Sequence, residues 1–198
     1  MLRVLGFLLC GLIATLPARA ADLAAIWHGT SWGEAGRDLA LHFGGEATIL
    51  ASPLIYGDSY TQVVLRDVEV GGVTLIAFFQ MDRKTGGLKR VQLERQRHGV
   101  NPPAFRGVVM GLEQAFGAPD ASCAAHPEPG NGFQAATELD WQRDGDLIRG
   151  IFRDTTVEAY EGCVTRDITT GPCGLTGQIL VRISPLGGDQ PEYRASSR

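Results

Sequence analysis

One spacing constrains the fold of this chain more than any other feature: hydrophobic and glycine positions recur 73 residues apart. The matched positions are Trp32 with Phe105, Leu39 with Leu112, Phe43 with Phe116, and Gly44 with Gly117. The same spacing relates two candidate hairpin turns, Gly71-Gly72 and Asp144-Gly145, and the phenylalanines that follow them, Phe79 and Phe152. A helix, a turn and a strand in one register predict an α+β fold of two tandem copies of a helix followed by an antiparallel β-meander.

Each predicted copy begins with a helix. In "SWGEAGRDLALHFG" (31–44), Ser31 and Glu34 form a capping-box pattern, and the apolar residues recur on one helical face. In "NPPAFRGVVMGLEQAFGAPD" (101–120), Asn101 is the N-cap, Pro102 suits the first helical position, and Gly117 ends the apolar stripe. The sequence therefore predicts one helix in each copy, the second over 102–116.

Three strands are predicted to follow each helix. Alternating apolar residues place them at 61–70, 73–81 and 88–95 in the first copy, and at 135–142, 146–153 and 178–184 in the second. Alternation fails around Arg66 and Asp67, which predicts a β-bulge there. The pattern leaves open whether the two sheets join edge to edge or pack face to face.

The N-terminal residues have the pattern of an export signal. Arg3 precedes the apolar run "VLGFLLCGLIATL", and "ARA" at 18–20 is a small-x-small cleavage site. Residues 1–20 are thus expected to be a signal peptide, and the mature chain to begin near Ala21 in the periplasm or outside the cell. Leu9 precedes Cys10, where a lipoprotein signal requires a small residue, so no lipid anchor is expected.

The predicted domain organisation follows from the repeat. The first helix-plus-sheet repeat covers 21–98, and the second covers 99–186 and contains a long loop at 155–178. The tail 187–198 is polar and is expected to be disordered. No later stretch approaches the roughly 20 apolar residues that a spanning helix needs, so no transmembrane segment is expected.

The charge balance bears on partners. Formal net charge is −4, and it becomes −6 on processing because Arg3 and Arg19 are lost. A mildly acidic chain without basic runs argues against nucleic acids and anionic membrane surfaces as partners.

Three cysteines remain after cleavage, and an oxidising compartment favours pairing of two of them. Cys163 and Cys173 both lie in the long loop, which a disulfide would hold compact, so this pair is favoured over either pairing with Cys123.

The motif Gly57-Asp58-Ser59 resembles the nucleophile motif of GDS-type serine hydrolases, which implies Ser59 as a catalytic serine. The chain lacks the Asp-x-x-His that this family carries near its C-terminus, so we interpret the motif as a turn that enters a strand. Cys123, three residues before His126 in a Pro/Gly-rich segment, is a second candidate nucleophile. Histidine and cysteine spacings match no metal site, and no metal or cofactor is predicted.

One set of side chains indicates a binding surface. Strand alternation places apolar and arginine side chains on the sheet face opposite the helices, with two tyrosines at the entry to the first sheet. The candidate partner-binding residues are Tyr56, Tyr60, Ile76, Phe78, Arg149, Ile151 and Arg153. Coverage of this face by the other copy or by the long loop is the competing interpretation.

Tandem helix-plus-sheet units after an export signal, with the loose "L-x-x-x-F-G" signature at 39–44 and 112–117, resemble the tandem-repeat β-lactamase inhibitory proteins. They are also similar to BamE-type envelope assembly lipoproteins, which carry one such unit. The resemblance implies an exported, non-enzymatic binding or assembly protein that uses its sheet surface. The alternatives are a serine or cysteine hydrolase using Ser59 or Cys123, and a carrier of a small ligand.

Overall fold

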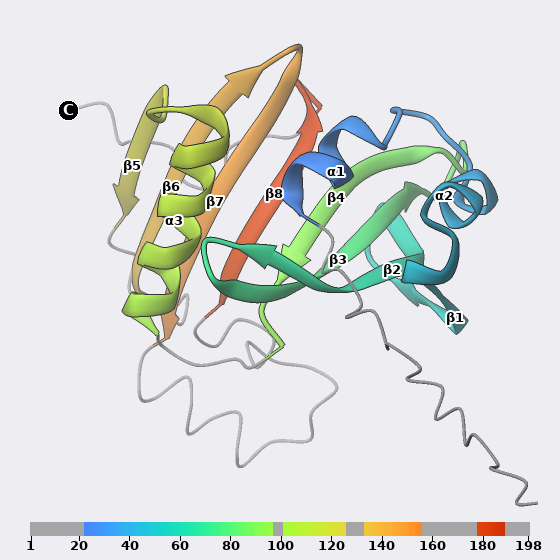
Figure 1. The fold of residues 1–198 in the computed structure, drawn as a ribbon, viewed down its shortest axis with the longest axis horizontal. Coiled ribbons are helices and arrows are strands. Elements are labelled where there is room, and N and C mark those ends of the chain that lie inside the picture. Colours follow the sequence, from blue (N-terminus) through green and yellow to red (C-terminus); the bar gives the residue numbers. More distant parts are fainter. Residues whose placement is uncertain (1–21, 97–100, 126–132, 156–177, 189–198) are drawn as a thin grey trace, which may run out of the picture.

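The computed structural model describes residues 22–96, 101–125, 133–155 and 178–188, and their strands form one eight-stranded antiparallel sheet (Figure 1). Its order is β1-β2-β3-β4-β8-β7-β6-β5. The strands are β1 Ala47–Ile55, β2 Ser59–Val70, β3 Val73–Asp82, β4 Leu88–Glu94, β5 Ala121–Ala125, β6 Phe133–Arg143, β7 Asp146–Thr155 and β8 Ile179–Pro185. The central neighbours β4 and β8 are far apart in the sequence.

Three α-helices pack on one face of this sheet (Figure 1). They are α1 Leu23–His28, α2 Gly36–Phe43 and α3 Pro102–Phe116. Each contributes buried side chains to one core, including Ile26 from α1, Leu39 from α2 and Leu112 from α3. The longest, α3, has 15 residues, and no helix in the described part of the chain is long and apolar enough to cross a bilayer.

The predicted fold of two helix-plus-meander repeats is wrong. The strands belong to a single continuous sheet, since β4 pairs with β8 from Val91 opposite Ile183 to Glu94 opposite Leu180. Two unpredicted strands, β1 and β5, form the outer edges. An unpaired strand edge exposes backbone donors and acceptors. Pairing between β4 and β8 removes two such edges, which explains why the halves merge.

The first predicted helix is also only partly correct. Ser31 and Glu34 do interact, because the Ser31 N–H donates to Glu34 Oε2 at 3.1 Å, but the bond closes a turn. The helix α2 begins only at Gly36. Backbone bonds to the start of β4 hold the preceding residues, with Gly33 N–H donating to the Leu88 carbonyl and Leu88 N–H to the Glu34 carbonyl, both at 2.8 Å. These tertiary bonds compete with helix formation. The short helix α1 was not predicted.

Several local predictions are confirmed. Helix α3 spans Pro102–Phe116, and Asn101 Oδ1 accepts from the Ala104 N–H at 3.0 Å. The predicted turns Gly71-Gly72 and Asp144-Gly145 each close a two-residue hairpin, with all four residues at positive φ. The strand pairing shifts register between Leu65 and Val68, which confirms the predicted bulge.

The tip of the β2–β3 hairpin packs directly on α3 (Figure 1). A Cβ on Gly71 would lie 1.8 Å from the Gly107 carbonyl oxygen, and one on Gly111 would lie 2.4 Å from the Gly71 nitrogen. Only glycines permit backbones to approach so closely. This contact fixes the hairpin against the helix and bounds one end of a cleft described below.

Some predictions concern segments outside the described residues. These are the signal peptide at 1–20, Cys163 and Cys173 with most of the long loop (156–177), and most of the tail (189–198).

Candidate functional site

The side chains of the strands alternate between the helix-bearing face and the opposite face, on which no described helix lies. We call the latter the helix-free face. Cross-strand register places on it Ile76, Phe78 and Gln80 of β3, Arg90, Gln92 and Glu94 of β4, Leu180 and Arg182 of β8, Arg149 and Ile151 of β7, and Glu138 and Asp140 of β6. It therefore carries apolar, basic and acidic groups together.

The structure brings four of the seven predicted partner-binding residues onto this face. Ile76 and Phe78 are partly exposed there, whereas Arg149 and Ile151 are 1% and 0% exposed. Tyr60 is different, because it packs against the core on the helix-bearing side.

Tyr56 and Arg153 are the remaining two predicted residues. Tyr56 follows β1, and burial, followed by the negative charge of Glu94, raises its pKa. Arg153 belongs to β7, but its side chain lies outside the described residues.

A polar network crosses the centre of the helix-free face. Arg90 Nε donates to Gln80 Oε1 at 2.6 Å, and Arg182 Nε donates to Gln92 Oε1 at 2.7 Å. The amide of Gln92 in turn donates to Glu94. These bonds link β3, β4 and β8 and restrict the rotamers of the side chains around Phe78. In the sequence, the only indication of this network was the set of polar residues within the strand segments "LKRVQLE" and "ILVRISP".

Arg149 forms a buried ion pair beside this network. Its Nε lies 3.5 Å from Glu138 Oε1 and 3.7 Å from Asp140 Oδ1, and the Arg149 and Glu138 side chains are each only 2% exposed. Arg182 lies directly opposite Arg149 in the register. The two carboxylates offset the repulsion that like charges in opposed positions produce.

Burial raises the pKa of Asp140 above its ordinary value of 3.8, an effect that the charge of Arg149 opposes only in part. The pKa of Asp120, in contrast, is lowered by a hydrogen bond from the Gln142 N–H and by Arg143. Folding therefore strengthens proton binding at Asp140 and weakens it at Asp120. The contribution of Asp140 to the free energy of unfolding falls as pH rises from below 3.8 through its raised pKa. That of Asp120 is present above 3.8 and is lost as pH falls through its lowered pKa.

We expect a carboxyl-carbon NMR titration of the folded protein to show these opposite shifts. Asp140 should titrate above 3.8 and Asp120 below it, because burial dominates at the first and hydrogen bonds to the carboxylate dominate at the second. Asp120 is the internal comparison. A midpoint for Asp140 equal to or below that of Asp120 would contradict the dominance of burial over the charge of Arg149 at this carboxyl group.

The interpretation of Gly57-Asp58-Ser59 as a turn is supported by the backbone. The Tyr56 N–H donates to the Ser59 carbonyl at 2.8 Å, so Gly57 and Asp58 form the loop of the β1–β2 hairpin. Lys89 pairs with Asp58, and Ser59 is 0% exposed. A buried hydroxyl is closed to a substrate arriving from solvent.

The other candidate nucleophile, Cys123, lies on β5 as a free thiol of intermediate exposure. His126 lies outside the described residues. Among the residues that the structure describes, no group of three or more His, Cys, Asp or Glu side chains could hold a metal ion.

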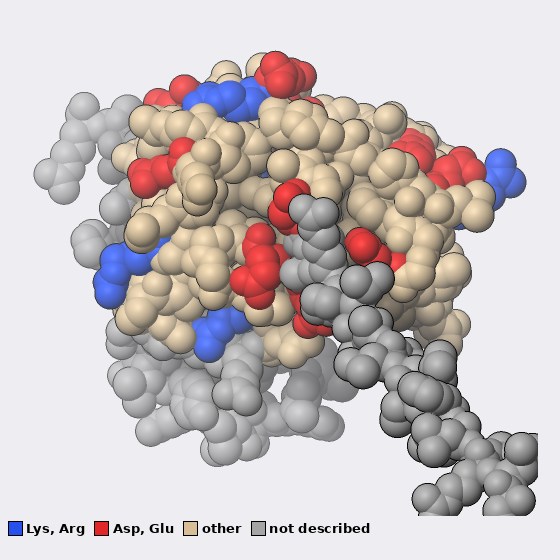
Figure 2. Space-filling model, viewed as in Figure 1, with Lys and Arg blue, Asp and Glu red and all other residues tan. Residues whose placement is uncertain are grey.

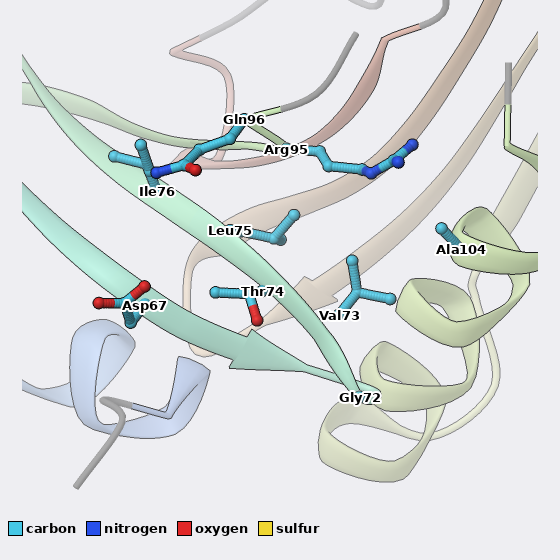
Figure 3. A pocket seen from close by; sticks show the side chains of 9 residues that line it. All are labelled: Asp67, Gly72, Val73, Thr74, Leu75, Ile76, Arg95, Gln96 and Ala104. Carbon is cyan, nitrogen blue, oxygen red and sulfur yellow. The ribbon is translucent and has the colours of Figure 1, made fainter. Parts of the chain in front are cut away.

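A cleft of about 340 Å³ opens beside β3 where β4 ends and the chain leaves toward α3 (Figure 3). Its walls come from the β2 bulge, β3, the end of β4 and the first turn of α3. The lining residues are Asp67, Gly72, Val73, Thr74, Leu75, Ile76, Arg95, Gln96 and Ala104. The bulge and the hairpin that shape the cleft were predicted from the sequence, whereas the cleft and its two charged residues were not.

Comparison of the chain with protein-family models, curated proteins and solved structures finds no match.

Proposed function

We propose that this chain is an exported, non-enzymatic binding protein that engages a protein or another component of the cell envelope through its helix-free face. The observation that carries the proposal is the position of Phe78. It is a partly exposed aromatic side chain, with Ile76 beside it, on a sheet whose surrounding polar groups are held by hydrogen bonds. The pattern of residues 1–20 supports export.

A preordered surface favours binding. Side chains that already occupy one rotamer lose little entropy when a partner docks, and aromatic and arginine residues contribute most to the affinity of protein interfaces. Arg182 lies in the same cross-strand row as Phe78, and Arg90 lies in the next row. The helix-free face thus combines two partly exposed apolar side chains, Ile76 and Phe78, with fixed polar neighbours, a mixture that protein interfaces also show.

The opposite side of the molecule is less suited to an acidic partner. Figure 2 shows acidic side chains gathered near the middle of the helix-bearing side, around α1 and the β2–β3 hairpin. Asp22, at the start of α1, lies beside Glu69 of this hairpin. Acidic residues concentrated in this way repel anionic surfaces.

The proposal is tested by in-cell cross-linking of the tagged protein in its native envelope, read by mass spectrometry. Phe78→Asp is expected to abolish cross-linking to a wild-type partner, because a buried carboxylate at an apolar contact is costly. The matched control is Met110→Asp on α3, since Met110 is 67% exposed on the opposite side. Circular dichroism checks that both variants fold. Equal loss in both variants, or a partner retained by Phe78→Asp, would refute the assignment to this face.

A further inference from the structure

In the cleft beside β3, part of the edge of β3 pairs with no strand of the described residues. The two-residue turn at Gly71-Gly72 makes Val70 and Val73 the hydrogen-bonded closing pair. Thr74, the next residue, therefore directs its backbone N–H and C=O away from β2. The pairing of β3 with β4 ends at Ile76 opposite Glu94, so β4 does not reach these groups. An extended chain could add to β3 at this position.

Two opposite charges line the same cleft without pairing. Asp67 occupies the β2 bulge with φ of +58°, and Arg95 directly follows β4. Neither side chain forms an ion pair or a hydrogen bond with any described residue, and they do not meet each other across the cleft. Figure 3 shows Arg95 extending on the α3 side of β3 and Asp67 on the β2 side. The cleft thus has an anionic and a cationic end.

The floor between these ends is apolar. The partly exposed Val73 and Ala104 contribute hydrophobic surface from both walls, next to the buried Leu75. A volume of about 340 Å³ is near the lower limit for small-molecule sites. A ligand with only negative charge would face Asp67, and one with only positive charge would face Arg95. The arrangement favours a small ligand that carries one charge of each sign.

We propose that this cleft binds a short peptide as a zwitterion. The peptide carboxylate pairs with Arg95, and the residue that carries it hydrogen-bonds to the backbone of Thr74 on the edge of β3 that faces β4. The rest of the peptide crosses β3, so that its ammonium group pairs with Asp67 on the β2 side. Small side chains of the peptide contact the apolar floor. This site shares Ile76 with the surface around Phe78, but it uses different polar and charged groups and does not rest on the proposed function.

The test is an NMR titration of the purified, isotopically labelled protein, expressed from its full sequence, with trialanine as the probe. We expect the amide signals of Thr74, Leu75 and Arg95 to shift with a dissociation constant on the order of 1 mM or tighter. N-acetyl-trialanine and trialanine amide, which each lack one charge, should bind about tenfold more weakly, because a charge-assisted hydrogen bond is lost in each.

Variants assign the charges to the two ends. Arg95→Gln should weaken trialanine at least about tenfold yet bind trialanine amide as the wild type does, because that probe has no carboxylate to lose. Asp67→Asn, in which asparagine tolerates positive φ, should also weaken trialanine at least about tenfold. It should bind N-acetyl-trialanine as the wild type does, because that probe has no ammonium group to lose. Arg37→Gln is the control, since Arg37 is 85% exposed on α2. Phe78→Asp should leave trialanine binding unchanged, which separates this site from the proposed interface.

Three results would overturn the proposal. They are no shift of these amides up to about 10 mM trialanine, equal affinity for the free and capped peptides, and unchanged binding by Arg95→Gln. Arg95→Lys keeps the positive charge and should retain most of the affinity. If Arg95→Gln fails to fold, Arg95→Lys and the capped probes still decide the question, and capped peptides that bind the wild type as well as trialanine would then refute it.

Discussion

Replacing Gly71 with alanine is expected to lower the free energy of unfolding by about 3 kcal/mol or more. The new Cβ would lie 1.8 Å from the Gly107 carbonyl oxygen of α3, so the hairpin or the helix must move. Alanine at φ of +57° adds backbone strain of about 1 kcal/mol. The main cost is thus the loss of the contact between the β2–β3 hairpin and α3.

The neighbouring glycine supplies a matched control. Gly72 has a similar φ of +74°, but a Cβ there would meet nothing within 4 Å. Gly72→Ala should therefore cost only the strain, about 1 kcal/mol. Urea unfolding followed by circular dichroism measures both variants. Equal losses would show that the close approach to α3 contributes nothing beyond the turn conformation.

Replacing Asp146 with alanine is expected to destabilise the fold by about 3 kcal/mol, since two hydrogen bonds to a charged acceptor are lost. Trp27 Nε1 donates to Asp146 Oδ2 and Trp32 Nε1 donates to Oδ1, each at 2.6 Å. This one carboxylate of β7 holds both α1 and the segment before α2. Trp27 also packs edge-on against Phe116 of α3, with ring centroids 5.1 Å apart.

Two comparisons isolate the hydrogen bonds of Asp146. Asp146→Asn keeps one acceptor oxygen and should cost about half as much, or about 1.5 kcal/mol. Asp144→Asn removes a nearby exposed charge at positive φ, which asparagine tolerates, and should leave stability nearly unchanged. Urea unfolding read by circular dichroism gives the free energies, and tryptophan emission reports the environment of the indoles. An Asp146→Ala variant as stable as Asp144→Asn would rule out a structural role for this carboxylate.

Local chemistry explains which elements could be predicted. Asn101, Pro102 and Gly117 act within one turn of α3, and the hairpin residues at 71–72 and 144–145 act within their own turns. Strands β1 and β5 lacked such signals. The first contains Pro53, shifts register between Ile49 and Leu54 and is largely exposed, and the second is the short run "ASCAA". Neither alternates as a half-buried strand does.

The candidate site shows the same division. Alternation alone was enough to place Ile76 with Phe78, and Arg149 with Ile151, on one face. Tyr60, expected at the entry to the first sheet, packs against the core next to a register shift between Thr61 and Val63, which alternation does not encode. The burial of Arg149 with Glu138 depends on packing that alternation does not encode.

The sequence by itself determined the second helix, the two primed hairpins, the bulge in β2 and the faces of the central strands, because each depends on residues close together in the chain. Only the tertiary structure decided that β4 and β8 join the strands into one sheet and that residues 31–35 bond with the start of β4 and not within a helix. It also decided that no strand of the described residues pairs with β3 beside Arg95. Those outcomes depend on backbone groups that are distant in sequence and compete for the same partners, and a local pattern carries no information about which partner is in reach.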